Sequence, residues 1–416
     1  MRQPLLYPAI ALALALGASN SGTAAHAQGA VKAFTGATLI DGSTRMPVAN
    51  ATLLVQDGKI LAAGAAANVR IPEGAERVAL SGKTVIPGLI NTHGHVNAAA
   101  DLATYAAYGI TTVFSLGGEP ADVFSARDSQ GSTTLNRARV YLAGPVLAPT
   151  SGADARAQVA SAAAQKVDII KIRVDDNLGT ASKMTPEVYR AVIDEAHKRG
   201  LRVAVHLYYL ADARDLLSAG ADFIAHSVRD LPVDAAFTAS LVKSGVCYTP
   251  TLMREVSTFV YESTPTFLTD SLFLTHANKG WIASVQQPAR QQAMKSSVSA
   301  QKYKAQLPVA QRNLKTLFDA GVPVVMGTDT GPMGRFQGYF ELMEIEMMVD
   351  AGMTPAQAIA ASTRDAARCL KLDSELGTLE RGKKADFLVL DASPLDGISN
   401  IRRINSVWIS GNRVPR

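Results

Sequence analysis

The chain has 416 residues, of which 47% are hydrophobic and 19% charged, and its formal net charge is +5 at pH 7. This composition is typical of a soluble globular protein with one large domain and a smaller accessory domain. Aromatic residues make up only 6% of the chain and no basic run stands out, so the pattern of a nucleic-acid-binding protein is absent. We interpret the mild positive charge as a solvated surface.

The first 27 residues have the organisation of a secretory signal peptide. Arg2 supplies a positive start, residues 9–16 are apolar, and Ala25-His26-Ala27 matches a small-x-small cleavage site. The apolar run is too short to cross a bilayer, which takes about 20 residues, and this disfavours a retained membrane anchor. We expect cleavage after Ala27, a periplasmic or secreted protein, and no membrane insertion of the mature chain.

The chain contains two cysteines, Cys247 and Cys369. Export would permit a disulfide, but Cys247 lies in a predicted buried strand and Cys369 in a predicted helix. We therefore predict two unpaired, buried thiols.

Short strands of alternating polarity are predicted near both ends of the chain. Near the start they are separated by Asp41-Gly42 and Asp57-Gly58, a dipeptide typical of hairpin turns. The predicted strands cover residues 31–37, 51–56, 59–63, 77–79, 385–390 and 406–409. We expect residues 28–84 and 377–416 to form one small composite β-sandwich domain.

Between these ends, helical stretches that end in glycine alternate with short apolar runs. In one helix Thr185 is a capping residue, Pro186 suits the first position and Gly200 ends the helix. Strands are predicted over residues 84–90, 110–115, 140–143, 168–172, 202–205, 222–225, 246–249 and 322–327. Eight strands alternating with helices predict an α/β fold, with a (β/α)₈ TIM barrel over residues 85–376.

Residues 251–302 follow the seventh predicted strand and are too many for a plain loop. Loops at the active face of a barrel commonly carry function. We expect a helical insertion over the active face that contributes to substrate selection.

Six residues with metal-binding or acid–base chemistry lie at or just after predicted strands. They are His93, His95, Lys171, His206, His226 and Asp329. The chain has only seven histidines, and four of them belong to this set. Because the reactive groups of a β/α barrel lie at the carboxyl ends of its strands, we expect these side chains to converge there.

The composition of this set predicts a metal site. Imidazole suits Zn²⁺, and His93 and His95 share one face because strand side chains alternate with period two. The set exceeds the needs of one ion, which favours a second metal ion and a bridging anion. Lys171 is the candidate for that anion, since a buried, neutral amine can react with CO₂ to form a carbamate. A plain cation or phosphate-binding group is the alternative for Lys171.

Asp329 is expected to ligate the first metal ion and to act as the catalytic residue. As general base it takes the proton from a metal-activated hydroxide that attacks the scissile carbonyl. As general acid it then returns this proton to the leaving nitrogen. The alternative is that Asp329 only caps the next helix.

Three segments resemble motifs of the amidohydrolase superfamily. They are Val-Ile-Pro-Gly-Leu-Ile-Asn-Thr-His-Gly-His at 85–95, Gly-Thr-Asp-Thr-Gly at 327–331 and Leu-Gly-Thr-Leu-Glu-Arg-Gly-Lys-Lys-Ala-Asp-Phe at 376–387. The resemblance covers nearly the whole mature chain. Asn91 departs from the Asp that family members often carry, at a position that is usually not a ligand.

A lysine on the fourth strand, with histidines on the fifth and sixth, resembles the binuclear branch of this superfamily. Within it the chain is most similar to imidazolonepropionase-like, prolidase-like dipeptidases. The resemblance implies two divalent metal ions, a carbamylated Lys171, and hydrolysis of a dipeptide or N-acyl amino acid. The alternatives are a cyclic amide, lactone or ester hydrolase with the same centre, and a non-catalytic metal or solute binder.

A small-molecule substrate with a carboxylate needs a donor in the protein, ideally Arg. Four residues close to the expected ligands are predicted to bind substrate: Tyr208, Arg173, Arg229 and Arg254. The alternative for each is that it is an ordinary polar residue at the rim of the active face. Similar proteins are commonly homo-oligomers, but the sequence does not demonstrate an oligomer here.

Overall fold

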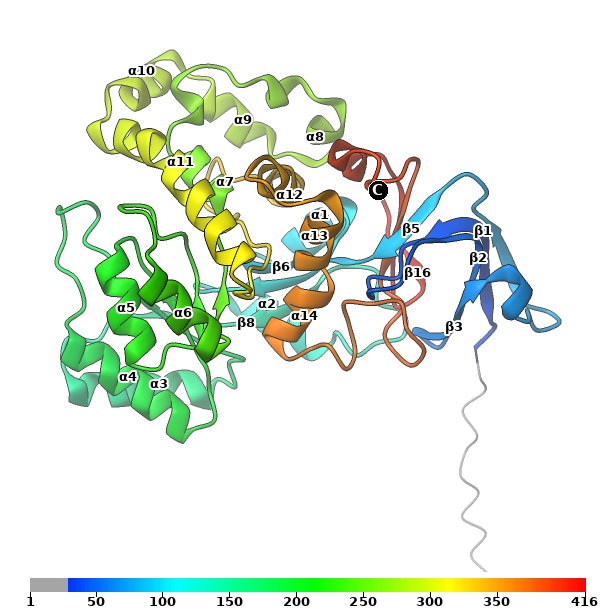
Figure 1. The fold of residues 1–416 in the computed structure, drawn as a ribbon, viewed down its shortest axis with the longest axis horizontal. Coiled ribbons are helices and arrows are strands. Elements are labelled where there is room, and N and C mark those ends of the chain that lie inside the picture. Colours follow the sequence, from blue (N-terminus) through cyan, green and yellow to red (C-terminus); the bar gives the residue numbers. More distant parts are fainter. Residues whose placement is uncertain (1–28) are drawn as a thin grey trace, which may run out of the picture.

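The computed structural model describes residues 29–416, and the predicted signal peptide lies outside them. Figure 1 shows a sheet that combines the first and last segments of the chain, beside a larger part in which strands and helices alternate. No helix in the described part of the chain combines the length and the apolar character needed to cross a membrane.

The two chain ends form one mixed sheet of eight strands (Figure 1), in the order β16-β15-β14-β5-β1-β2-β3, with β4 paired to β1. The strands are β1 (Lys32–Leu39), β2 (Val48–Gln56), β3 (Lys59–Ala65), β4 (Glu76–Ala79), β5 (Thr84–Pro87), β14 (Phe387–Leu390), β15 (Ile404–Ile409) and β16 (Asn412–Arg413). Two stacked sheets were expected. Hydrogen bonding instead makes one sheet, because β5 pairs with β1 on one side and with β14 on the other.

Aromatic packing stabilises the junction of the two chain ends. The Phe34 ring lies 4.9 Å from that of Phe387 and 4.7 Å from that of Trp408, in edge-to-face arrangements. Such pairs contribute about 0.5–1.5 kcal/mol each beyond their buried area. The β2–β3 hairpin closes through Asp57 and Gly58, whose φ angles of 50° and 77° suit a tight turn between twisted strands.

The strand predicted over residues 84–90 is two strands in two different sheets. After β5, the chain enters β6 (Leu89–Gly94), which pairs in parallel with β7 (Ile110–Ser115). Gly88 lies at the junction, where a Cβ atom would meet Thr111 Oγ1 at 2.1 Å. The apolar run is continuous through this point, so periodicity alone does not reveal the change of sheet.

The remaining strands form two parallel sheets, β6-β7-β8 and β13-β12-β11-β10-β9. Their other members are β8 (Arg139–Leu142), β9 (Val146–Leu147), β10 (Ile170–Arg173), β11 (Val203–His206), β12 (Phe223–Ile224) and β13 (Cys247–Tyr248). The amide of Asp168 donates to the carbonyl of Leu142, which connects the approach to β10 with the end of β8.

The segment predicted as the eighth strand is not a regular strand. It forms isolated parallel bridges, Tyr248↔Val324 and Gly94↔Thr330. Further backbone bonds run from Thr92 N to Met326 O and from Val325 N to Tyr248 O, both at 3.0 Å. Pro323 lacks an N–H group, which limits regular pairing here. The segment nevertheless connects one parallel sheet to the other.

Helices separate most of the parallel strands. They are α1 (Asp101–Ala107), α2 (Ala121–Asp128), α3 (Gly152–Ala164), α4 (Pro186–Lys198), α5 (Leu210–Ser218) and α6 (Ala235–Ser244). Three further helices, α12 (Tyr339–Asp350), α13 (Pro355–Ala361) and α14 (Arg364–Leu370), follow the last parallel strand. Helix α4 has Thr185 at its N-cap position and Pro186 at its start, although the Thr185 side chain makes no capping hydrogen bond. Gly200 follows it with φ 71°.

Residues 251–302 are mainly helical in the structure. The helices here are α7 (Leu252–Ser257), α8 (Ser271–His276), α9 (Lys279–Val285) and α10 (Pro288–Ser296), and α11 (Val298–Asp319) follows. In Figure 1, α8 to α11 lie together on one side of the strands.

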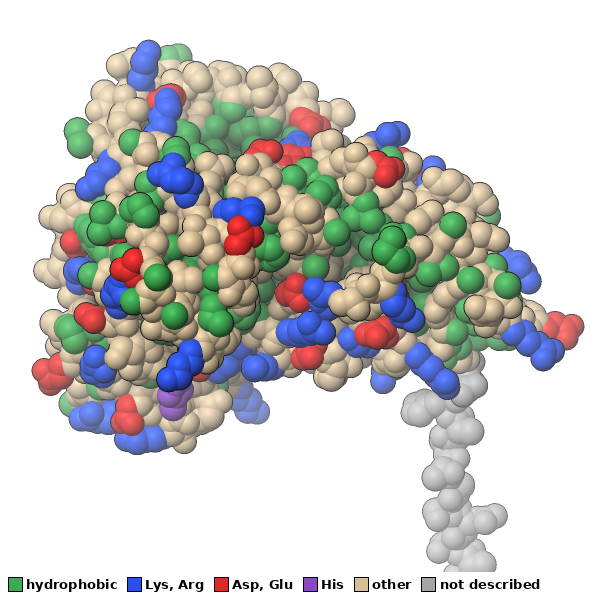
Figure 2. All heavy atoms as spheres, viewed as in Figure 1, with side chains coloured by type: hydrophobic (Ala, Val, Ile, Leu, Met, Phe, Trp, Pro, Cys, Tyr) green, Lys and Arg blue, Asp and Glu red, His purple; other side chains and the backbone are tan. Residues whose placement is uncertain are grey.

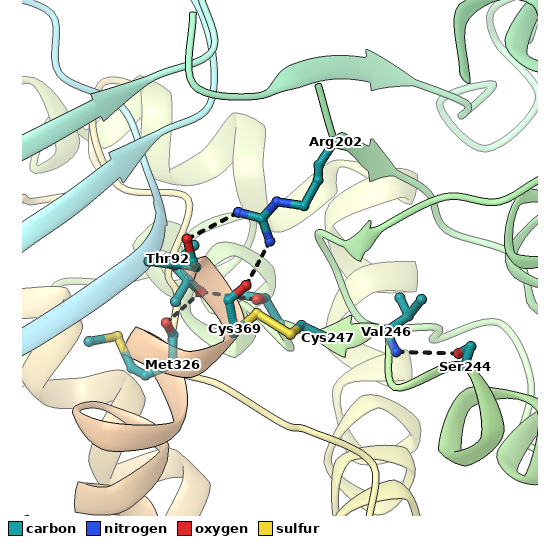
Figure 3. Close-up of a disulfide and its surroundings, with 9 residues drawn as sticks. Thr92, Arg202, Ser244, Val246, Cys247, Met326 and Cys369 are labelled. Carbon is teal, nitrogen blue, oxygen red and sulfur yellow. Dashed lines mark hydrogen bonds between the residues drawn. A yellow bond between two sulfur atoms is a disulfide. The ribbon is translucent and has the colours of Figure 1, made fainter. Parts of the chain in front are cut away.

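The prediction of two unpaired thiols is wrong, because Cys247 and Cys369 form a disulfide (Figure 3). The fold brings the start of β13 against α14, with the two Cα atoms 6.0 Å apart across a sequence separation of 122 residues. Arg202 supports the bridge by donating to the carbonyls of Cys369 at 2.7 Å and Leu370 at 3.2 Å. A pairing between two distant elements leaves no local signal in the sequence.

Replacing both cysteines with alanine should lower the free energy of unfolding by about 4–5 kcal/mol, because the bridge closes a long loop in the unfolded chain. Urea unfolding of the oxidised wild type and of Cys247→Ala/Cys369→Ala measures this loss. Reductant should shift the midpoint of the wild type and leave the double variant unchanged. Equal midpoints for the oxidised and reduced wild type would contradict the expectation.

Candidate metal centre

His93, His226 and Asp329 form a buried cluster. One donor atom from each lies within 4.8 Å of the other two. His93 is on β6, and its carbonyl accepts the Asp329 amide at 2.7 Å. Asp329 has a left-handed backbone with φ 58°, which is uncommon for a residue other than glycine. The backbone therefore fixes Asp329 directly against the strand that carries His93.

His95 joins this cluster through Asp329. Its Nε2 lies 2.8 Å from Asp329 Oδ1, and its Nδ1 lies 3.0 Å from the carbonyl oxygen of Gly117. A carbonyl only accepts hydrogen bonds, so Nδ1 carries a proton. In the neutral ring Nε2 then directs a lone pair at a carboxylate. Two acceptors this close require a shared cation, either a proton or a metal ion.

The second half of the set lies beside the first. The His226 ring centroid is 4.6 Å from that of His93 and 4.1 Å from that of His206. Lys171 on β10 is only 3% exposed. Within residues 29–416, neither Lys171 Nζ nor His93 Nδ1 has a hydrogen-bond partner. Unpartnered buried polar atoms are costly, so this site suits a ligand that uses them.

Burial disfavours the charged forms of His93, His206, His226 and Lys171. Desolvation lowers the pKa of His93 and His226 well below the ordinary value and that of His206 to about 3. Burial also lowers the pKa of Lys171 to about 7, with Asp329 opposing and Arg173 reinforcing the shift. Neutral imidazoles and a partly neutral amine are the protonation states that metal ligation requires.

Asp329 is ionised despite its burial. Desolvation alone would raise its pKa, but the Arg335 guanidinium, the hydrogen bond with His95 and the neighbouring imidazoles hold the pKa well below its ordinary value. Arg335 Nη1 lies 2.5 Å from Asp329 Oδ2, so the two carboxylate oxygens face different partners. The cluster combines neutral nitrogen donors with one anionic oxygen donor, a set that fits Zn²⁺.

Three groups that orient this cluster were not predicted from the sequence. They are Asp175, Thr251 and Arg335. Asp175 Oδ2 accepts from His206 Nε2 at 2.9 Å, which leaves Nδ1 as the lone-pair nitrogen of that ring. Thr251 Oγ1 lies 2.8 Å from His226 Nδ1. Each follows a predicted strand or a ligand by only a few residues, and that proximity is the signal that would have found them.

The predicted substrate residues Arg229 and Arg254 lie in a buried cluster with Glu255. Glu255 Oε2 is 3.0 Å from Arg229 Nε and 3.1 Å from Arg254 Nη1. The first contact is an ion pair without hydrogen-bond alignment, because Arg229 Nε has no hydrogen-bond partner among the described residues. The Arg254 guanidinium lies 4.7 Å from the Tyr303 ring centroid on α11. Two cations therefore share one carboxylate.

Tyr208 belongs to this cluster, and Arg173 does not. The Arg229 guanidinium lies 4.7 Å from the Tyr208 ring centroid, and the Tyr208 hydroxyl donates to Gln306 on α11. The Arg173 side chain is 42% exposed and pairs with Asp175 at 3.3 Å. Strand parity suggested an inward Arg173, but β10 ends at this residue, and its side chain is not constrained by the strand face.

The chain belongs to the Amidohydrolase family, which its residues 84–414 match. With the buried histidine–carboxylate group, this membership makes it a metal-dependent hydrolase of that family. Imidazolonepropionase of Geobacillus kaustophilus is 39% identical over 77 residues. That match spans only 18% of this chain and 18% of the relative.

Two solved structures resemble nearly the whole chain. One is from Bifidobacterium longum and carries a prolidase name. It is 27% identical to this chain, with a TM-score of 0.75, and the match covers 93% of this chain and 95% of that structure. A Xaa-Pro dipeptidase with methionine bound in its active site is 21% identical with a TM-score of 0.73, covering 92% and 99%. The similarity to this second structure shows a shared fold.

Asp175→Asn should weaken metal binding by about ten- to a hundredfold, because it removes the charge that orients His206. Competition with a chromophoric chelator measures the dissociation constant for zinc. Asp176→Asn is the matched control, since Asp176 accepts from the Tyr209 hydroxyl instead. Equal zinc affinity in Asp175→Asn and the control would show that Asp175 has no such role.

Proposed function

We propose that the chain is an exported, binuclear metal-dependent hydrolase that cleaves the carbon–nitrogen bond of a dipeptide or N-acyl amino acid. The observation that carries this proposal is the close, partly buried approach of His95 Nε2 to Asp329 Oδ1 at 2.8 Å, with the buried His93 and His226 beside them. The names of the two similar structures, prolidase and Xaa-Pro dipeptidase, support a dipeptide substrate.

The proposal includes a closed (β/α)₈ barrel. The parallel pairing within each sheet, the bridges made by Gly94 and Tyr248, and the bond from Asp168 N to Leu142 O all support it. In such a barrel the ligands share the carboxyl ends of the strands, where barrel enzymes have their active sites.

We propose that His93, His95 and Asp329 would hold one metal ion and that His206 and His226 would hold a second, with a carbamylated Lys171 as a further ligand for both. The residues suit Zn²⁺. When bound, the ions supply Lewis acidity, which activates water and polarises the scissile carbonyl.

The carbamate forms from the neutral lysine amine. The nitrogen lone pair of Lys171 attacks CO₂, and a C–N bond forms as one C=O π bond opens and places its electrons on oxygen. One N–H proton then leaves to solvent. The product is an anion with two oxygens that can bind metal. The Lys171 ammonium group, in contrast, has no lone pair and cannot bind metal. A pKa of about 7 leaves a substantial neutral fraction of Lys171 at neutral pH.

Asp329 is the proposed proton carrier. Arg335 holds its Oδ2, while Oδ1 faces His93 and His95. Because the carboxylate is ionised at working pH, it can accept the proton of the attacking water and deliver it to the leaving nitrogen.

The excess positive charge of the Arg229–Arg254–Glu255 cluster is the proposed anchor for the substrate carboxylate. Arg254 lies close enough to the centre that its positive charge helps to lower the pKa of His206. The negative charge of Asp329 in turn helps to raise the pKa of Arg254. Tyr208 packs against Arg229. Arg173, which faces Asp175 instead, is not part of the proposed anchor.

Export is supported by the disulfide, because such bonds persist mainly in oxidising compartments. On the face shown in Figure 2, basic and acidic side chains are interspersed, which favours a small-molecule substrate over a nucleic acid.

The zinc-loaded protein should release free amino acid from dipeptides or N-acyl amino acids, and a chelator should abolish release. Asp329→Asn should lower kcat by about 10²–10⁴-fold, since the amide cannot accept the proton. Amino-acid release across a substrate panel, with matched amides that lack the carboxylate, measures both effects. Turnover of lactones or cyclic amides alone would reject the proposed substrate, and full activity in Asp329→Asn would reject its proposed role.

Carbamylation of Lys171 should increase with pH through about 7, because its pKa is lowered and only the neutral amine reacts. At constant CO₂ pressure, the ¹³C carbamate signal of the metal-free protein should rise from about pH 5.5 to about pH 8.5. Lys171→Met should lack this signal. A signal that persists in Lys171→Met, or a wild type without one at either pH, would contradict the assignment.

A further inference from the structure

Helix α12 carries two fully buried glutamates three residues apart, Glu341 and Glu344. Carboxyl groups are rarely buried completely, and they require partners when they are. Neither glutamate belongs to the six-residue ligand set. Their partners identify what they do.

Glu341 holds the segments that carry His93 and Asp329. Its Oε1 accepts three hydrogen bonds, from Asn91 Nδ2 at 2.6 Å, Thr328 Oγ1 at 2.8 Å and Thr330 Oγ1 at 2.5 Å. The two threonines flank Asp329 in the chain. Asn91 in turn accepts the backbone amide of His93 at 2.9 Å. One oxygen atom of Glu341 therefore connects β6 with the segment that contains Asp329.

Glu344 holds the segment that orients His226. Its Oε1 accepts the amide of Leu252 at 2.8 Å, and its Oε2 accepts the amide of Met253 at 2.6 Å. The preceding residue, Thr251, contacts His226 Nδ1 and has φ 47°. This left-handed conformation is strained for a β-branched residue and persists only when its surroundings enforce it. The two backbone bonds to Glu344 provide that restraint.

We propose that Glu341 and Glu344 are positioning residues, which set the metal affinity of the centre by fixing His93, Asp329 and His226 from α12. This inference rests on the proposed function, because it assumes that these residues bind metal. It explains why a largely apolar helix retains two buried carboxyl groups.

The hydrogen bonds predict different responses to the same substitution. Glu341 uses a single oxygen, so Glu341→Gln can keep all three bonds through its amide oxygen. Glu341→Met has similar length but no strong acceptor. Glu344 uses both oxygens, so Glu344→Gln places an amide N–H against a backbone N–H and loses one bond.

The test is the zinc affinity of metal-free protein, measured by chelator competition. Glu341→Met and Glu344→Gln should bind zinc about ten- to a hundredfold more weakly, and Glu341→Gln should stay within about threefold of the wild type. The matched control is Glu346→Gln on the same helix. Glu346 pairs with Arg402 at 2.6 Å and, within residues 29–416, makes no hydrogen bond to these segments, so its variant should bind zinc like the wild type.

Far-UV circular dichroism and urea midpoints should be recorded for every variant. Wild-type affinity in folded Glu341→Met and Glu344→Gln would overturn the inference, as would an equal loss in Glu346→Gln. If Glu344→Gln does not fold, the contrast between Glu341→Gln and Glu341→Met decides the question for Glu341, and equal affinities there would overturn it. A wild type that does not bind zinc would instead refute the proposed function.

Discussion

Three imidazoles, an amine and a carboxylate are buried close together in this protein, and this burial determines the chemistry of the site. Desolvation lowers the pKa of His93, His206 and His226, so these imidazoles are neutral, and it lowers the pKa of Lys171 to about 7, so part of this amine is neutral. These neutral nitrogen donors face the ionised Asp329. A divalent cation would stabilise the buried carboxylate, whereas apolar surroundings alone would not.

Surrounding groups keep these donors in place. Several donor residues are each contacted by a neighbouring group, among them a backbone carbonyl, Asp175, Thr251 and Arg335. The parallel strands bring residues that are distant in the sequence to one end of the sheets. Buried polar networks are stable only when their members are satisfied, which makes such a centre sensitive to residues that never touch a ligand.

The sequence predicts that His93, His226 and Asp329 lie together, as they do in the structure, because these residues follow apolar runs and parallel strands share a common end. It fails where distant elements meet. The Cys247–Cys369 bridge and the separation of β5 from β6 both depend on tertiary contacts. Glu341 gives no sequence signal either, since a glutamate in a helix ordinarily reads as an exposed residue.

The number of zinc ions bound per chain tests whether the centre is binuclear. The mature protein, stripped with chelator and reloaded with zinc in the presence of bicarbonate, is analysed by inductively coupled plasma mass spectrometry. We expect two zinc ions per chain in the wild type and fewer in Lys171→Met. A wild type that retains no zinc would contradict the metal centre itself. One zinc ion in both proteins would contradict the binuclear, carbamate-bridged centre.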